Sequence, residues 1–94
     1  MTREEVRDLL ARTHDFPTFY TIKAIGASAS DFVSRVLLAA RHSLEREVHL
    51  RHSVRSTTRG EHVAVTLDIM VQNADEVLEV YQALEAVGGM KLLM

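Results

Sequence analysis

Basic side chains on and around one predicted strand are the groups in this sequence best suited to bind a charged partner. They are arginines spread over residues 46–59 and two lysines that we expect nearby across a sheet: Arg46, Arg51, Arg55, Arg59, Lys23 and Lys91. Guanidinium and ammonium groups donate strong hydrogen bonds to carboxylates and phosphates. A run of charge more often marks a solvated face that protects an edge strand from aggregation. The alternative is a site for a small anionic ligand or an acidic protein partner.

A second candidate is the segment Thr57-Thr58-Arg59-Gly60, the predicted tip of a hairpin. Its hydroxyls, its fork-shaped guanidinium and its flexible glycine are suited to grip a phosphate or a carboxylate. In the simpler interpretation, Gly60 supplies a positive φ for the turn and the threonines suit strand ends. The predicted ligand or partner contacts are therefore Lys23, Arg55, Arg59 and Gly60.

Catalytic and metal-binding groups do not come together in this sequence. The chain has no cysteine, which excludes a thiol nucleophile, a disulfide and a thiolate metal site. His49 and His52 point to opposite faces of a predicted strand, while His14 and His42 lie at helix ends, so no pair has the spacing of metal ligands. The sequence predicts no catalytic residue, no metal site and no cofactor.

Hydrophobic periodicity predicts the strands that position the basic residues. Apolar residues alternate over 48–55 and 63–72, two runs joined across residues 58–61 as one long hairpin. The first run is half polar, so we place it at a sheet edge. A third strand is predicted over 18–26 and a short fourth strand over 90–94.

Helical spacing predicts three helices. Each begins with a polar cap followed by an acid three residues later, in the pairs Thr2 and Glu5, Ser28 and Asp31, and Asn73 and Glu76. Ser28 and Ser30 could also suggest a nucleophile. A nucleophilic serine needs a paired base or a strained glycine-x-serine-x-glycine turn, so we prefer the capping role.

The order of these elements defines the fold class. One domain is expected over 1–94, with a helix over 1–14 ahead of a strand-helix-strand-strand-helix-strand core over 16–94. Two right-handed crossovers joined by a hairpin give an α+β, ferredoxin-like βαββαβ sandwich. We expect a four-stranded antiparallel sheet with the first and third strands in the centre, two helices on one face, and the extra N-terminal helix.

Several short motifs resemble the YbeD-like family of small bacterial proteins of unknown function. They occur in that family's order: Phe16-Pro17 with Tyr20, Lys23 and Gly26, then Thr57-Thr58-Arg59-Gly60, Tyr81 with Leu84, and Lys91-Leu92-Leu93-Met94. In the family the hairpin usually reads serine-serine-lysine-glycine with an aromatic residue after it, whereas this chain has threonines, Arg59 and His62. The resemblance implies a fold similar to ACT regulatory domains and a ligand-binding or regulatory module without established catalytic activity.

Two other functions of this fold have less support. Acylphosphatases hold a phosphate in the loop after the first strand, but residues 25–31 contain no basic residue and place Asp31 where the anion would dock. RNA-recognition domains stack bases on outward aromatics of the central strands, where only Phe19 is available. A nucleic-acid-associated protein using the arginine-rich second strand is our alternative function, and an acylphosphatase-type hydrolase ranks last.

The outer face of the sheet is expected to carry an apolar patch made by Phe19, Met70 and Leu93. An apolar group of this kind is a candidate contact surface. Either the apolar stripe of the N-terminal helix folds over the patch, or a second copy of the chain covers it in a homodimer formed through the edge of the fourth strand.

Length and charge limit the function further. The 94 residues suit one small domain, and a net charge of −2 argues against a protein built chiefly to coat nucleic acid or an anionic membrane. No run approaches the roughly 20 apolar residues of a membrane span. We expect a small cytoplasmic, non-enzymatic regulatory or binding module whose partner is a small anionic ligand or a protein, rather than nucleic acid.

Overall fold

The computed structural model describes residues 1–29, 31–57 and 59–94. Within them the chain forms, in order, α1 (Arg3–Thr13), β1 (Thr18–Ala27), α2 (Phe32–His42), β2 (Leu50–Ser56), β3 (His62–Val71), α3 (Ala74–Glu85) and β4 (Met90–Leu93). The strands form one antiparallel sheet in the order β2-β3-β1-β4. The predicted ferredoxin-like α+β fold, with the first and third strands in the centre, is confirmed.

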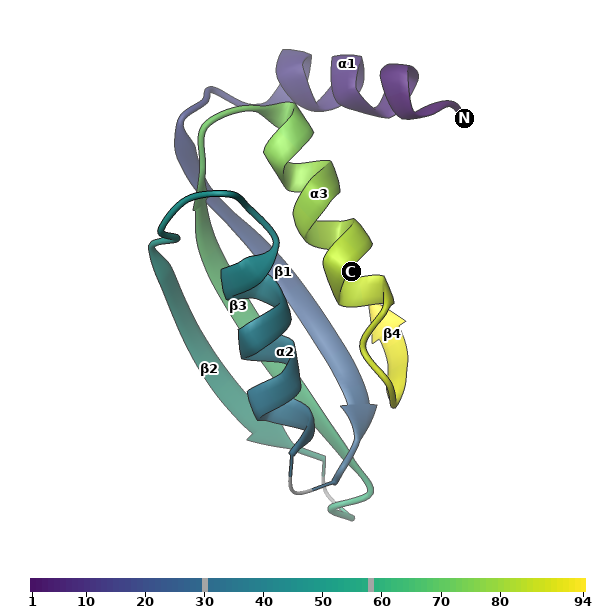
Figure 1. The fold of residues 1–94 in the computed structure, drawn as a ribbon. Coiled ribbons are helices and arrows are strands. Elements are labelled where there is room, and N and C mark those ends of the chain that lie inside the picture. Colours follow the sequence, from purple (N-terminus) through teal and green to yellow (C-terminus); the bar gives the residue numbers. More distant parts are fainter. Residues whose placement is uncertain (30, 58) are drawn as a thin grey trace.

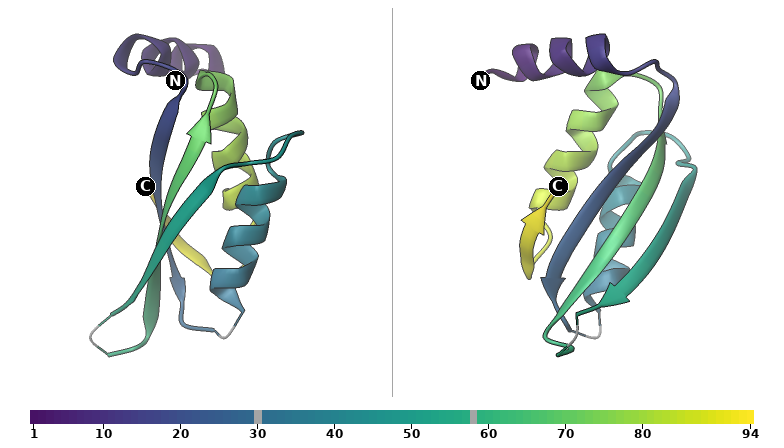
Figure 2. Two further views of the ribbon diagram at one scale, coloured as in Figure 1. Left: turned by 90° about the vertical axis from the view of Figure 1, so that its left-hand side faces the viewer. Right: turned by 180° about the vertical axis from the view of Figure 1, so that it is seen from behind.

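The helices α2 and α3 lie side by side on one face of this sheet (Figure 1). The view from behind shows that no helix of the described chain lies in front of the strands on the other side (Figure 2). We call this second surface the outer sheet face. It consists of the strand side chains that point away from α2 and α3.

The core lies between the sheet and the two helices. Along β3, burial alternates without a break, and every second residue faces the helices with an exposed fraction of 6% or less: Val63, Val65, Leu67, Ile69 and Val71. The helices meet this row with the apolar stripes predicted from their spacing, including the fully buried Phe32, Val36, Val77, Val80 and Leu84. Removal of this apolar surface from water is the main force that holds the layers together.

Two of the three predicted helix caps are confirmed. The Thr2 side chain accepts a hydrogen bond from the Glu5 backbone N–H, and Asn73 accepts one from Glu76 in the same way. The prediction for Ser28 is wrong, because α2 begins later and Asp31 is its N-cap residue, without a side-chain capping bond. Ser30 lies outside the described residues. No described helix combines the length and the apolar character needed to cross a membrane.

Helix α1 docks in a different place from the one predicted. It contacts α3 and lies across one end of the two layers, so it does not fold over the outer sheet face (Figures 1 and 2). No residue of α1 is fully buried, and Leu9 remains 44% exposed. Part of its apolar stripe is buried, because Leu10 packs against the core.

The predicted apolar patch of the outer sheet face forms only in part. Phe19 and Met70 are direct partners across β1 and β3, and both belong to this face. Leu93 instead pairs with Ala24, a fully buried residue of the helix-covered face, and packs against the core. Directly paired residues of antiparallel strands share a face, so Leu93 cannot join the other two.

Gly26 allows the closest approach between the sheet and α2. A Cβ atom at this position would clash with the Phe32 ring and would lie 2.8 Å from the Gly89 carbonyl oxygen. Phe32 is fully buried, so its ring has no free space into which it can move. The absence of a side chain at Gly26 therefore sets how deeply the first turn of α2 can pack.

We predict that Gly26→Ala lowers the free energy of unfolding by about 2–3 kcal/mol, because overpacking a closed core forces side chains and backbone to shift. The matched control is Gly88→Ala, whose added Cβ would meet only the flexible end of Arg35 at 3.3 Å. We expect that control to change stability by less than about 1 kcal/mol. Urea denaturation followed by circular dichroism measures both, and equal losses in the two variants would contradict the packing role of Gly26.

Candidate functional site

A groove on the outer sheet face brings together two of the predicted contact residues. It has a volume of about 310 Å³ and is lined by Lys23, Ser53, Val54, Arg55, Ala64 and Thr66. The pairing of the strands explains this assembly, because Ser53 is opposite Thr66 and Thr66 is opposite Lys23. Arg55 follows one step along, opposite Ala64. We call this site the outer-face groove.

The chemistry of the outer-face groove suits an anion. Lys23 and Arg55 supply two positive charges, Ser53 and Thr66 supply two hydroxyl donors, and no acidic residue lines the groove. The small side chain of Ala64 leaves room between the two cations. Charge-assisted hydrogen bonds from ammonium and guanidinium groups are the strong contacts used to hold phosphates and carboxylates.

The other two predicted contacts lie at the hairpin tip and do not line the groove. Gly60 has a φ of 69° and donates its N–H to the Thr57 carbonyl at 2.9 Å. The Thr57 hydroxyl accepts a hydrogen bond from the His62 backbone N–H at 3.2 Å. The simpler interpretation of Gly60 as a turn residue is thus confirmed. Arg59 is exposed beside it, and Thr58 lies outside the described residues.

An aromatic cluster lies further along the outer sheet face. The Arg51 guanidinium reaches across β3 and lies 4.1 Å from the centre of the Phe19 ring. His49 meets the same ring edge-on at 5.4 Å. Between this cluster and the groove, the Thr21 hydroxyl donates to an Asp68 carboxylate oxygen at 2.6 Å. One face of Phe19 is therefore already occupied by a cation, an arrangement worth about 0.5–1 kcal/mol at an exposed site.

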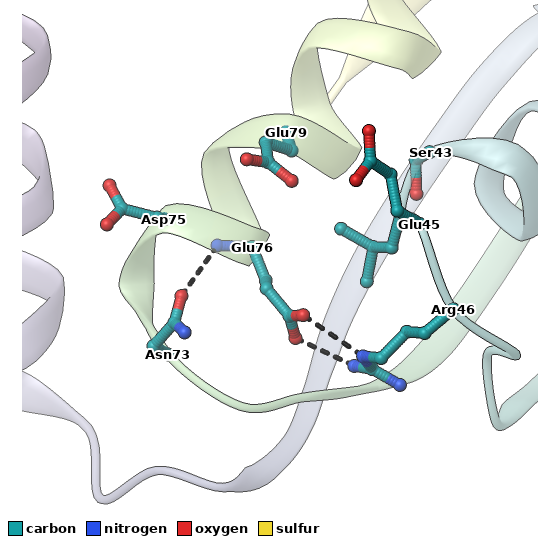
Figure 3. A pocket seen from close by; sticks show the side chains of 8 residues that line it. Ser43, Glu45, Arg46, Asn73, Asp75, Glu76 and Glu79 are labelled. Atoms are coloured by element: carbon teal, nitrogen blue, oxygen red, sulfur yellow. Dashed lines mark hydrogen bonds and ion pairs between the residues drawn. The ribbon is translucent and has the colours of Figure 1, made fainter.

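A second cavity, of about 560 Å³, lies on the helix side between the loop after α2 and the start of α3. Its wall contains Glu45, Asp75, Glu76 and Glu79 (Figure 3). Arg46 is the basic residue there. Its Nη2 and Nε donate to the two carboxylate oxygens of Glu76 at 2.7 and 3.0 Å, and Nη2 also donates to the Met70 carbonyl at 3.0 Å.

Arg46 therefore does not belong to the basic edge predicted from the sequence. It joins the loop that leads into β2 to the last residues of β3 and the first turn of α3. Glu76 completes this junction by accepting the Gln72 backbone N–H at 2.7 Å. The Arg46 hydrogen bonds lower the pKa of Glu76 from its ordinary value, and they raise the pKa of Arg46 in turn. The arrangement is a structural clamp rather than an open binding site.

Arg35, in the first turn of α2, forms an ion pair with Asp31 at 3.2 Å and donates to the Gly88 carbonyl oxygen. Its guanidinium is thus committed to holding α2 beside the turn before β4. Among the described residues, no group of three or more histidine or acidic side chains could hold a metal ion.

Sequence reasoning missed Ser53 and Thr66 as members of the groove. Both lie on the same strand faces as predicted contacts, since Ser53 is two residues from Arg55 and Thr66 is paired with Lys23. Alternation along each strand already placed these side chains outward. The local pattern does not give the register between the strands, which brings the outward residues of three strands into one site.

The fold is that of an ACT-like domain. The structure matches the ACT domain from GTP pyrophosphokinase of Chlorobium tepidum with a TM-score of 0.64 and 14% sequence identity, covering 82% of this chain and 95% of that domain. The sequence pattern of the family described as "Protein of unknown function (DUF493)" matches residues 11–94, so the chain belongs to that family. A UPF0250 protein of Pasteurella multocida (strain Pm70) is 23% identical over 94 residues, the full length of both chains. These matches agree with the YbeD-like resemblance of the sequence.

We predict that Glu76→Gln lowers the free energy of unfolding at neutral pH by about 1–3 kcal/mol, because it weakens the charged hydrogen bonds of a side chain that is only 17% exposed. The folded-state pKa of Glu76 lies below its ordinary value of 4.5, so its stabilisation is present above that pH. It is lost as the pH falls through the lower, folded-state value.

Denaturation at a series of pH values between 2 and 7 measures this effect. The stability of Glu76→Gln should fall less steeply on acidification than that of the unaltered protein. Glu79→Gln, at an exposed position of the same helix, is the matched control and should follow the unaltered profile. Identical profiles for all three proteins would show that the clamp does not depend on the Glu76 charge.

Proposed function

We propose that this protein is a non-enzymatic regulatory module that recognises an anionic group on the outer face of its sheet. The observation that carries the proposal is the meeting of Lys23 and Arg55 with two hydroxyls in one groove. These four side chains come from three different strands, and the register of the sheet holds them in place. The anionic group belongs to a small ligand or to a protein partner.

Membership of a family of unknown function with an ACT-like fold supports a binding role. Two carboxylates of the described chain are engaged within the protein: Glu76 binds Arg46, and Asp68 accepts from Thr21. A module that binds without reacting needs only a complementary surface. The outer-face groove provides one, because its polar groups are directed at the solvent rather than at one another.

The alternative function is association with a single-stranded nucleic acid. The observation in its favour is the cluster of Phe19, His49 and Arg51, which lies on the same face as Lys23 and Arg55. Proteins that bind single-stranded nucleic acids usually stack the bases on aromatic side chains and hold the phosphate backbone with basic residues. We rank it second because Arg51 already covers one face of Phe19, and a continuous stacking platform needs further aromatics.

Isothermal titration calorimetry with inorganic phosphate at low ionic strength tests the proposal. We predict that Lys23→Ala and Arg55→Ala each weaken phosphate binding by about 5–10-fold, since each removes one charge-assisted contact. Arg41→Ala, at an exposed position of α2 on the opposite side of the molecule, is the matched control and should leave the affinity unchanged.

Two results would overturn the proposal. One is no measurable phosphate binding to the unaltered protein. The other is a loss of binding in Arg41→Ala as large as in the groove variants, which would indicate a nonspecific response to net charge. Titration with a short single-stranded RNA in the same buffer tests the alternative, which requires Phe19→Ala to reduce affinity and added salt to weaken it steeply.

A further inference from the structure

The strand β2 leaves one side of the sheet open along its whole length. It is the terminal strand in the order β2-β3-β1-β4, and β3 is its only neighbour among the described residues. All of its residues after Leu50 are exposed, including Val54 at 47%. The views in Figure 2 show it at the margin of the sheet, beyond the two helices. An exposed edge of this kind is a template for pairing with another extended chain.

The register shows which backbone groups of β2 are available. Two hydrogen bonds flank the strand, one from the Met70 N–H to the His49 carbonyl and one from the Thr57 N–H to the His62 carbonyl. In an antiparallel ladder, residues facing the neighbouring strand alternate with residues facing away from it. His49 and Thr57 face β3, so every second residue between them does too. The N–H and C=O groups of Leu50, His52, Val54 and Ser56 therefore point outward.

The side chains along this edge select the charge of a partner. The seven residues of β2 include Arg51 and Arg55 and contain no acid. Both arginines belong to the outer sheet face, on either side of Ser53. They lie four positions apart, which corresponds to about 13 Å along an extended strand. Acidic side chains at the same spacing on a partner strand would lie directly opposite them. To meet such a partner, Arg51 would turn from the Phe19 ring toward the free edge.

The same charges disfavour pairing with a second copy of β2. In an antiparallel pair centred on Ser53, Arg51 of each copy would face Arg55 of the other. Like charges directly opposite each other destabilise a strand pair. This arrangement disfavours that register of a β2–β2 pair, whereas an acidic segment would meet both arginines favourably.

We propose that an extended acidic protein segment adds to the free edge of β2, with two acidic side chains four residues apart opposite Arg51 and Arg55. The inference rests on the proposed function, because Arg55 belongs to both the outer-face groove and the free edge of β2. It identifies the anionic group as an acidic side chain of a protein partner. The partner's backbone would pair with the outward groups of Leu50, His52, Val54 and Ser56. Its alternate side chains would cover Val54.

A synthetic peptide with two glutamates four residues apart in a background of threonine and valine is the probe. Fluorescence anisotropy of the labelled peptide measures its affinity for the full chain. We predict that Val54→Pro weakens binding at least tenfold, because it removes an outward N–H that β3 does not use. Proline is tolerated on an edge strand in this orientation. Val54→Thr, which keeps the N–H, is the matched control and should bind within about twofold of the unaltered protein.

Charge reversal gives an independent test that does not depend on the proline. The double variant Arg51→Glu, Arg55→Glu should no longer bind the acidic peptide. It should instead bind a peptide that has lysines in place of the glutamates. Thermal unfolding followed by circular dichroism verifies that each variant is folded. A failure of the reversed pair to bind, or equal binding by Val54→Pro and Val54→Thr, would overturn the inference.

The outcomes separate this inference from the proposed function. Phosphate binding that depends on Lys23, together with no peptide binding, would overturn edge addition and leave the outer-face groove intact. Peptide binding that Val54→Pro abolishes, together with no phosphate binding, would support edge addition and overturn the groove. Concentration-dependent self-association through β2, detected by sedimentation and removed by Val54→Pro, would contradict the acidic partner as occupant.

Discussion

The antiparallel ladder between β1 and β3 is the constraint on which the rest of the structure depends. It pairs ten residues of each strand, from Thr18 with Val71 to Ala27 with His62, without a shift in register. Side chains alternate between faces along a strand, so a slip of one residue would send every apolar side chain to the solvent. The burial of Leu67 and Ile69 beneath the helices therefore fixes the opposite face as well. Lys23 and Thr66 come together there because this register pairs them on the face opposite the core.

Two local contacts then hold the helices against that ladder. Gly26 lets the Phe32 ring pack at the start of α2, and the Arg46–Glu76 pair ties the start of α3 to the end of β3. Both contacts lie at the ends of the long central strands, one at each end. Both hold the helices on one side of the sheet, so the outer sheet face remains uncovered by the described helices.

Local sequence signals were enough to predict most of this fold. Alternation along β3 and the caps at Thr2 and Asn73 are signals that extend over a few residues each. They agree with one another and with the order of the elements. The failures concern tertiary context. The face of Leu93 depends on a register shift between Ile25 and Gly26 in the pairing with β4, which no local pattern encodes. Arg46 looked like one more edge cation because its partner, Glu76, lies 30 residues away.

The central claim is that the outer sheet face is where this protein meets its anionic partner. Amide chemical-shift mapping of the isotope-labelled chain, titrated with inorganic phosphate, tests it most directly. The expected result is a set of shifts confined to Lys23, Ser53, Arg55, Thr66 and their neighbours on the three strands. Shifts concentrated around Ser43, Glu45 and Asp75, at the cavity on the helix side, would contradict the claim, as would small shifts spread evenly over the chain.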